Sequence, residues 1–84
     1  MATLTKKEVS WVEQQIQFYF DRLDRYEDME NKLREEGNNE RADKYAECYR
    51  DARSRLDGVY DIVSALGYMW GFDENDKVHL SKRE

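Results

Sequence analysis

The sequence predicts a single all-α domain over residues 1–84, an antiparallel hairpin of two long helices that pairs with a second copy into a four-helix bundle. Three observations lead to this fold class. The 84-residue chain has no proline and only four glycines, and charged residues make up 39% of it, a composition typical of long surface helices. Apolar residues recur at alternating steps of three and four along two stretches. A turn containing Gly37 separates these stretches.

The first helix is expected to run from about residue 6 to residue 36. Thr5 and Glu8 have the spacing of a capping box, in which each side chain accepts a hydrogen bond from the backbone amide of the other. From there, apolar residues form one seam along a single helix face. The seam consists of Val9, Val12, Ile16, Tyr19, Leu23, Tyr26 and Leu33, interrupted once by the charged Glu30.

The second helix is expected over about residues 40–67, after a turn at residues 37–39. Asn38 or Asn39 can cap its first turn, and Gly67 can take the left-handed conformation that ends a helix. Pairing the two seams so that residue numbers add to about 75 sets large residues against small ones, so each seam is the partner of the other. The second seam consists of Ala42, Tyr45, Tyr49, Ala52, Leu56, Val59, Val63, Leu66 and Trp70.

Glu30 is the one charged member of either seam, and this pairing places it opposite Tyr45. A carboxylate in that position can accept the hydrogen bond of the phenol. We therefore expect Glu30 and Tyr45 to fix the register of the two helices.

The C-terminal stretch, residues 68–84, differs in character from the helices. Two short apolar or mixed runs flank a cluster of turn-forming residues at 73–76, which favours a small β-hairpin. The turn lacks an Asn-Gly or Asp-Gly pair, so an irregular tail folded over the open end of the helices is the alternative. In either case Trp70 and Phe72 are expected to pack near Leu4 and Val9.

The chain has more apolar residues than one seam can bury. Trp11 and Phe18 lie seven residues apart, on a helix face well away from the seam. A second copy of the hairpin can cover this surplus as a homodimer, or Trp11 and Phe18 can stay exposed as anchors for a different protein. The predicted protein-contact residues are Leu4, Trp11, Phe18, Tyr60, Ile62, Met69, Trp70 and Phe72.

Charge and hydropathy argue against several classes of partner. The net charge is −5 and no basic stripe is present, so direct binding to nucleic acid is not expected. No apolar run approaches the roughly 18 residues of a membrane span, and Met1 to Lys7 lacks the pattern of a signal peptide. A single cysteine, Cys48, cannot form an internal disulfide, which fits the cytoplasm.

Residues for catalysis or metal binding are scarce. His79, the only histidine, has no nucleophile in an identifiable relation to it, and Cys48 lies beside the second seam. The carboxylates lack the Glu-x-x-His pairs of a di-iron bundle. We therefore expect no enzyme activity, no cofactor and no metal, and predict a non-enzymatic protein-protein interaction module.

A row of acidic residues follows one face of the first helix at seven-residue spacing: Asp21, Asp28 and Glu35. Basic residues alternate with the acidic ones, so the simplest interpretation is a solvated face with pairs such as Glu30 with Arg34 and Asp51 with Arg55. Alternatively, an acidic face can block a nucleic-acid-handling protein by electrostatic complementarity.

The run EEGNNERADKYAECYRDARSRLDGVYDIVSALGY resembles small two-helix proteins of bacteriophages and mobile elements. The resemblance rests on the glycine-containing turn, the Ala-x-x-Tyr start of the second helix and its Leu-Gly-Tyr ending. It implies an accessory role, including inhibition of a host or defence protein through the acidic face or the aromatic stripe.

Overall fold

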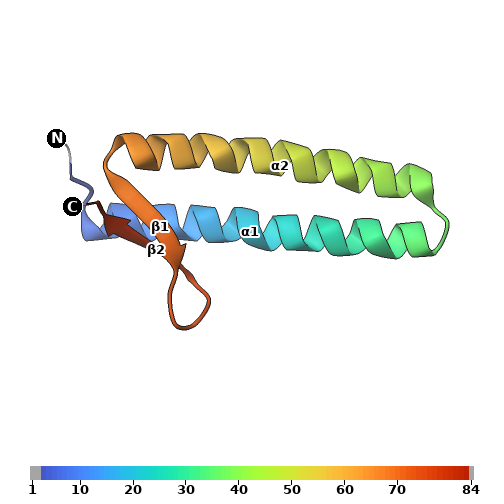
Figure 1. Ribbon diagram of the computed structural model, residues 1–84, viewed down its shortest axis with the longest axis horizontal. Coiled ribbons are helices and arrows are strands. Elements are labelled where there is room, and N and C mark those ends of the chain that lie inside the picture. Colours follow the sequence, from blue (N-terminus) through green and yellow to red (C-terminus); the bar gives the residue numbers. More distant parts are fainter. Residues whose placement is uncertain (1–2, 84) are drawn as a thin grey trace.

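Two long helices lie side by side, and a small two-stranded sheet crosses one end of the pair in the computed structural model (Figure 1). The helices are α1 (Lys6–Glu35) and α2 (Asn39–Ala65), and the strands are β1 (Tyr68–Phe72) and β2 (Val78–Lys82). The structure describes residues 3–83; residues 1, 2 and 84 of the predicted domain 1–84 lie outside that range. The antiparallel helical hairpin is thus confirmed, with extents of 51 × 25 × 19 Å.

Both helix starts follow from local capping. The amide of Glu8 donates to Thr5 Oγ1 at 3.1 Å and the amide of Thr5 donates to Glu8 Oε1 at 2.9 Å, so the predicted capping box is present. At the turn, Gly37 has φ +80° and Asn38 accepts from the amide of Arg41. The observed helices therefore agree with the predicted ranges to within two residues.

The core lies along the two seams and continues beneath the sheet. Ile16 and Leu23 of α1 are buried against Ala52 and Leu56 of α2, so large and small residues alternate across the pair as the sequence predicts. A second buried cluster lies at the end where the sheet covers the helices, and it consists of Val63, Tyr68 and Leu80. The sheet is therefore part of the hydrophobic core.

The end of α2 corrects one expectation. Trp70 is not the last member of a helical seam, because α2 ends at Ala65 and Gly67, with φ +85°, turns the chain away. Trp70 lies instead in β1, opposite Leu80 of β2. Of the two alternatives for the C-terminal stretch, the β-hairpin is the one that forms.

The turn between the strands is built on Asp73. Its carboxylate accepts hydrogen bonds from the amides of Asn75 at 2.8 Å and Lys77 at 3.0 Å. These side-chain bonds hold the turn without a glycine. Asp76 takes the left-handed conformation, φ +58°, that Asn-Gly and Asp-Gly turns assign to glycine. An aspartate side chain thus replaces the turn signal that the sequence lacks.

Candidate functional site

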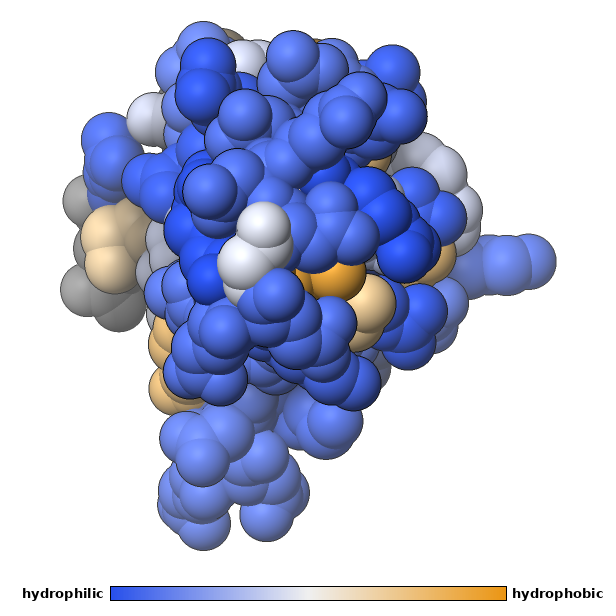
Figure 2. Space-filling model, turned by 90° about the vertical axis from the view of Figure 1, so that its right-hand side faces the viewer, coloured by the Kyte–Doolittle hydropathy of each residue, from blue (hydrophilic) through white to orange (hydrophobic). Residues whose placement is uncertain are grey.

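Among residues 3–83, five large apolar side chains remain exposed, and none of them lies at the turn between the helices. Their exposed fractions are 61% for Trp11, 48% for Phe18, 64% for Ile62, 50% for Met69 and 54% for Phe72. All come from the half of the molecule that carries the sheet. By contrast, the surface seen from the turn end is mostly hydrophilic, with a small apolar patch near its centre (Figure 2). Exposed apolar residues gathered in one half of a small protein mark a contact surface.

Trp11 and Phe18 are the most prominent of these residues. They lie two helical turns apart on α1, so both project from the same side of that helix. The guanidinium carbon of Arg22 lies 4.5 Å from the centroid of the Phe18 ring and partly covers it. Trp11 borders a shallow hollow whose other walls are polar side chains of the first turns of α1. Neither ring contributes to the buried core.

Ile62 lies on the side of α2 away from the sheet. Tyr60, two residues earlier and hence about 200° around the helix, faces the sheet and stacks on Trp70. The cleft between the helices on the side of Tyr19 and Cys48 is only about 80 Å³. Small-molecule sites enclose roughly 300 Å³ or more, so this cleft does not form one.

Three of the eight predicted contact residues instead pack within the fold. The rings of Tyr60 and Trp70 stack with centroids 4.5 Å apart and an interplanar angle of 5°, and Leu4 packs against the cluster beneath the sheet. Trp70 packs against the same buried cluster as Leu4 and Val9, and its ring also lies 5.3 Å from that of Phe20. Phe72 does not pack against that cluster; its ring lies 5.4 Å from that of Phe20.

The expected pairing of Glu30 with Tyr45 is replaced by another arrangement. Glu30 Oε2 accepts from Arg34 Nε at 3.0 Å, and Arg34 also donates to Asp43 Oδ1 at 3.0 Å. Within the described residues, Tyr45 has a packing contact with Tyr26, at 6.2 Å between ring centroids, and no hydrogen bond to Glu30. A guanidinium one turn along the same helix is a stronger donor to a carboxylate than a phenol.

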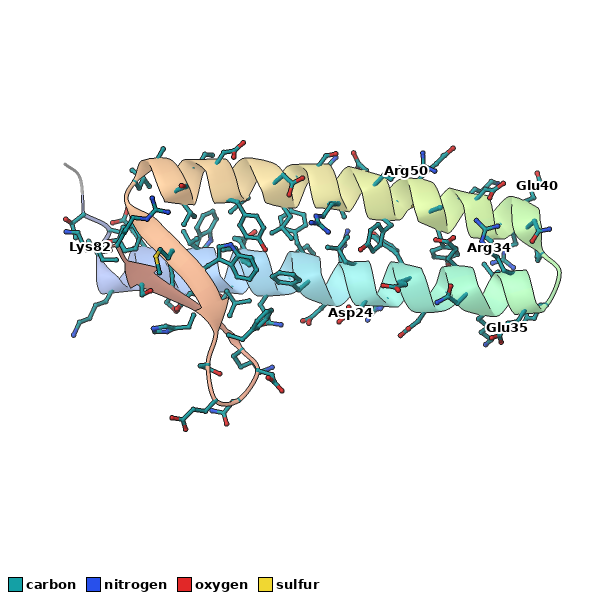
Figure 3. All side chains as sticks on the ribbon, in the orientation of Figure 1. Asp24, Arg34, Glu35, Glu40, Arg50 and Lys82 are labelled. Carbon is teal, nitrogen blue, oxygen red and sulfur yellow. The ribbon has the colours of Figure 1, made fainter. Side chains whose placement is uncertain are left out.

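Arg34 is the residue that connects the helices near the turn. It reaches from α1 toward α2 (Figure 3) and joins one carboxylate on each. These groups are partly exposed, so the pairs contribute little stability and act mainly on register. The sequence paired Arg34 with Glu30 correctly but gave no signal of Asp43, nine residues further on and across the turn.

The acidic row Asp21, Asp28 and Glu35 is exposed on α1. Elsewhere on the surface, carboxylates are paired with arginines as predicted: Arg34 with Glu30 at 3.0 Å, and Arg55 with Asp51 at 3.4 Å. A further pair, Arg53 with Asp57, is 3.6 Å long. The negative charge is therefore interrupted by cations along both helices.

Chemistry-bearing side chains are scattered over the surface. His79 is exposed, with Nδ1 3.4 Å from the carboxylate of Glu13, and Cys48 is exposed on α2. In residues 3–83, no three His, Cys, Asp or Glu side chains are grouped so that they could hold a metal ion. Neither helix of this part of the chain is both long and apolar enough to cross a membrane.

Comparison with known proteins leaves the site to be argued from its geometry. The chain matches no protein-family model, no curated protein and no solved structure. The resemblance to small bacteriophage and mobile-element proteins therefore stays a prediction from the sequence. The geometry provides an exposed aromatic pair on α1 and a two-stranded sheet in which side chains of α1 bond to the outer edge of β2 but not to that of β1.

Proposed function

We propose that this protein is a non-enzymatic protein-protein interaction module of the cytoplasm that works as a homodimer. The observation that carries the proposal is the exposure of Trp11 and Phe18 on one side of α1, next to a core that is already closed without them. Removing about 150 Å² of aromatic surface from water stabilises a complex by about 4 kcal/mol. Two such rings are a substantial driving force for association.

A second copy suits this surface because the stripe on α1 is short and can be self-complementary. In a two-fold dimer with antiparallel α1 helices, Trp11 of each chain meets the region of Phe18 of the other. The two helical hairpins then form a four-helix bundle. Ile62, on the side of α2 away from the sheet, extends the same apolar surface toward the second helix.

Light scattering after size-exclusion chromatography tests the proposal. We expect twice the 10.2 kDa of one chain, falling to one chain in a Trp11→Glu/Phe18→Glu variant. Asn31→Glu, which adds a carboxylate to an exposed position of α1 near the turn, away from the two rings, is the matched control and should stay dimeric. A chain that is monomeric at every concentration up to the millimolar range contradicts the homodimer.

The alternative is an inhibitor that blocks a nucleic-acid-handling protein of a host or defence system. The exposed row Asp21, Asp28 and Glu35 and the net charge of −5 favour it. An affinity pull-down from the source cell should then recover a basic partner at low salt and lose it with the variant Asp21→Asn/Asp28→Asn/Glu35→Gln. The arginine pairs that interrupt the acidic surface make this the weaker of the two proposals.

A further inference from the structure

The outer edge of β2 is closed by side chains of α1. The amide of Leu80 donates to Glu13 Oε2 at 2.7 Å, and the amide of Val78 donates to Gln17 Oε1 at 2.9 Å. Glu13 and Gln17 lie one turn apart on α1, which matches the two-residue spacing of outward amides along a strand. Two of the three outward amides of β2 are thus bonded to α1, and only that of Lys82, at the end of the strand, is left for a further strand.

The outer edge of β1 is open. In an antiparallel ladder, residue pairs that are hydrogen-bonded alternate with pairs that are not. The bonds from the amide of Arg83 to Gly67 and from that of Asp73 to Lys77 mark the bonded pairs, so Met69 with Ser81 is also a bonded pair. The amides that point away from β2 are those of Tyr68, a buried residue, and of the more exposed Trp70 and Phe72. Within residues 3–83, none of these three amides has a hydrogen-bond acceptor.

This edge also lacks the usual protection against pairing. Exposed edge strands are normally guarded by lysine, proline, a bulge or a covering element. β1, with the sequence YMWGF, has no charged residue and no proline, whereas the covered β2 carries Lys82. The unguarded strand is thus the one with free backbone groups.

A groove runs along the open edge. β1 leaves the end of α2 and diverges from it, so that the two elements form a V (Figure 1). The space between them, about 470 Å³, is lined by Tyr60, Asp61 and Ser64 of α2, by Met69 and Trp70 of β1, and by Arg83 after β2. The stacked rings of Tyr60 and Trp70 give it apolar surface. The groove has free backbone donors on one wall and a helix on the other.

We propose that this groove binds an extended segment of another protein, which adds to β1 as the third strand of the sheet. The free amides of this edge recur at every second residue, and only the carbonyl groups of a chain in the β conformation have the spacing to accept from all of them. The aromatic surface of the groove favours apolar side chains at alternate positions of that segment.

A second copy of this chain does not fit the same edge. Antiparallel pairing of β1 with β1 of another copy is two-fold about an axis perpendicular to the sheet, which places both pairs of helices on the same side. The free edge of β1 faces the length of α1 and α2 that continues toward the turn (Figure 1). The helices of the second copy would have to occupy that space.

Amide hydrogen exchange tests the open edge in the free protein. The amides of Trp70 and Phe72 should exchange fast, and those of Val78 and Leu80 slowly, at all protein concentrations. Protection of the β1 amides that increases with concentration would mean that a second copy occupies the edge, and would overturn the proposal.

Selection from a library of random eight-residue peptides tests the partner class. The bait is the Trp11→Glu/Phe18→Glu chain, so the result does not depend on the proposed homodimer. Enriched peptides should carry apolar residues at alternate positions. Methylating the peptide backbone nitrogens one at a time should lower affinity about five- to tenfold at every second position and little at the intervening ones, since each bond to the strand is worth about 1–1.4 kcal/mol.

A pair of protein variants isolates the backbone. Phe72→Pro removes the outward amide of Phe72, whereas Phe72→Ala removes only the ring and keeps the amide. Proline should weaken binding of a selected peptide about tenfold relative to alanine, provided that the Leu80 amide stays slow in both. If proline disturbs the hairpin, the methylation scan decides alone. A library without enriched peptides, or a scan without a period of two, overturns the proposal.

Discussion

The carboxylate of Glu13 in α1 accepts a hydrogen bond of 2.7 Å from the backbone amide of Leu80 in β2, 67 residues further along the chain. Gln17 makes the equivalent bond to Val78. Two polar side chains of one helix thus satisfy two outward amides of β2, which pairs with β1 in a two-stranded sheet. This contact places the sheet across the helices and decides which of its edges is left open.

Replacing Glu13 by alanine should destabilise the fold. The amide of the buried Leu80 would lose its acceptor, and a hydrogen bond to a charged group contributes about 1.5–3 kcal/mol. Urea unfolding followed by circular dichroism measures the change, with Gln14→Ala, at an exposed position, as control. Glu13→Gln keeps an oxygen acceptor and should lose less. Equal stability of Glu13→Ala and Gln14→Ala would show that the contact contributes nothing.

The helical hairpin was predictable because its signals are local and periodic. The seams repeat at steps of three and four, Gly37 and Gly67 mark the two helix ends, and Thr5 with Glu8 is a spacing of three. The limits lie beyond Gly67. The four-residue step from Leu66 to Trp70 fits a helix, whereas the aromatic residues at every second position, Tyr68, Trp70 and Phe72, fit a strand equally well. Only the positive φ of Gly67 decides between the two patterns.

The candidate site was less predictable, because a surface depends on what the tail covers. Trp11, Phe18 and Ile62 lie off the seam and stay exposed, as their periodicity suggests. Tyr60 and Trp70 are predicted contact residues as well, but their rings stack on each other once the sheet folds over α2. Glu13 and Gln17 look like ordinary polar residues at the flank of a helix. Their role requires contacts with residues more than sixty positions away.

Asp73 should stabilise the hairpin turn more strongly when it is ionised. Hydrogen bonds from the amides of Lys77 and Asn75 hold the pKa of this carboxyl below its ordinary value of 3.8. A lowered pKa in the folded state means that the contribution is complete above about pH 4 and is lost as the pH falls through the folded value. Asp73→Ala should lower the thermal midpoint at pH 7, with a smaller effect at pH 2.

Asp73→Asn is the informative control, since its side-chain oxygen can still accept from both amides but carries no charge. It should lie between the wild type and Asp73→Ala at pH 7. A difference between wild type and Asp73→Ala that is the same at pH 2 and pH 7 would exclude the ionised carboxylate as its source.

Tyr60 should become less stabilising at high pH. Burial raises the pKa of Tyr60 to about 12 from an ordinary value of 10.0, and among the described residues its buried hydroxyl has no hydrogen-bond partner. Because the folded state holds this proton more tightly, the stability linked to it is present below pH 10 and is lost as the pH rises from 10 to 12. Between pH 8 and pH 11, the thermal midpoint of unfolding should fall further for the wild type than for Tyr60→Phe.

At pH 7, Tyr60→Phe should be as stable as the wild type or more stable by up to about 1 kcal/mol, because it removes an unsatisfied hydroxyl and keeps the ring on Trp70. Tyr19→Phe, another half-buried tyrosine, is the matched control. A clear loss of stability in Tyr60→Phe would mean that the hydroxyl has a partner in solution.

Gly58→Ala should stabilise the folded chain by up to about 1 kcal/mol, the difference in helix propensity between the two residues at an exposed interior position. Gly58 lies within α2, and a Cβ atom built there meets nothing within 4 Å in this chain. Urea unfolding of the monomeric Trp11→Glu/Phe18→Glu background measures this gain without any contribution from association. The same substitution in the native background reports on the dimer. If light scattering finds weaker association there although the monomer is stabilised, a partner backbone approaches Gly58, and the interface extends over the outer face of α2.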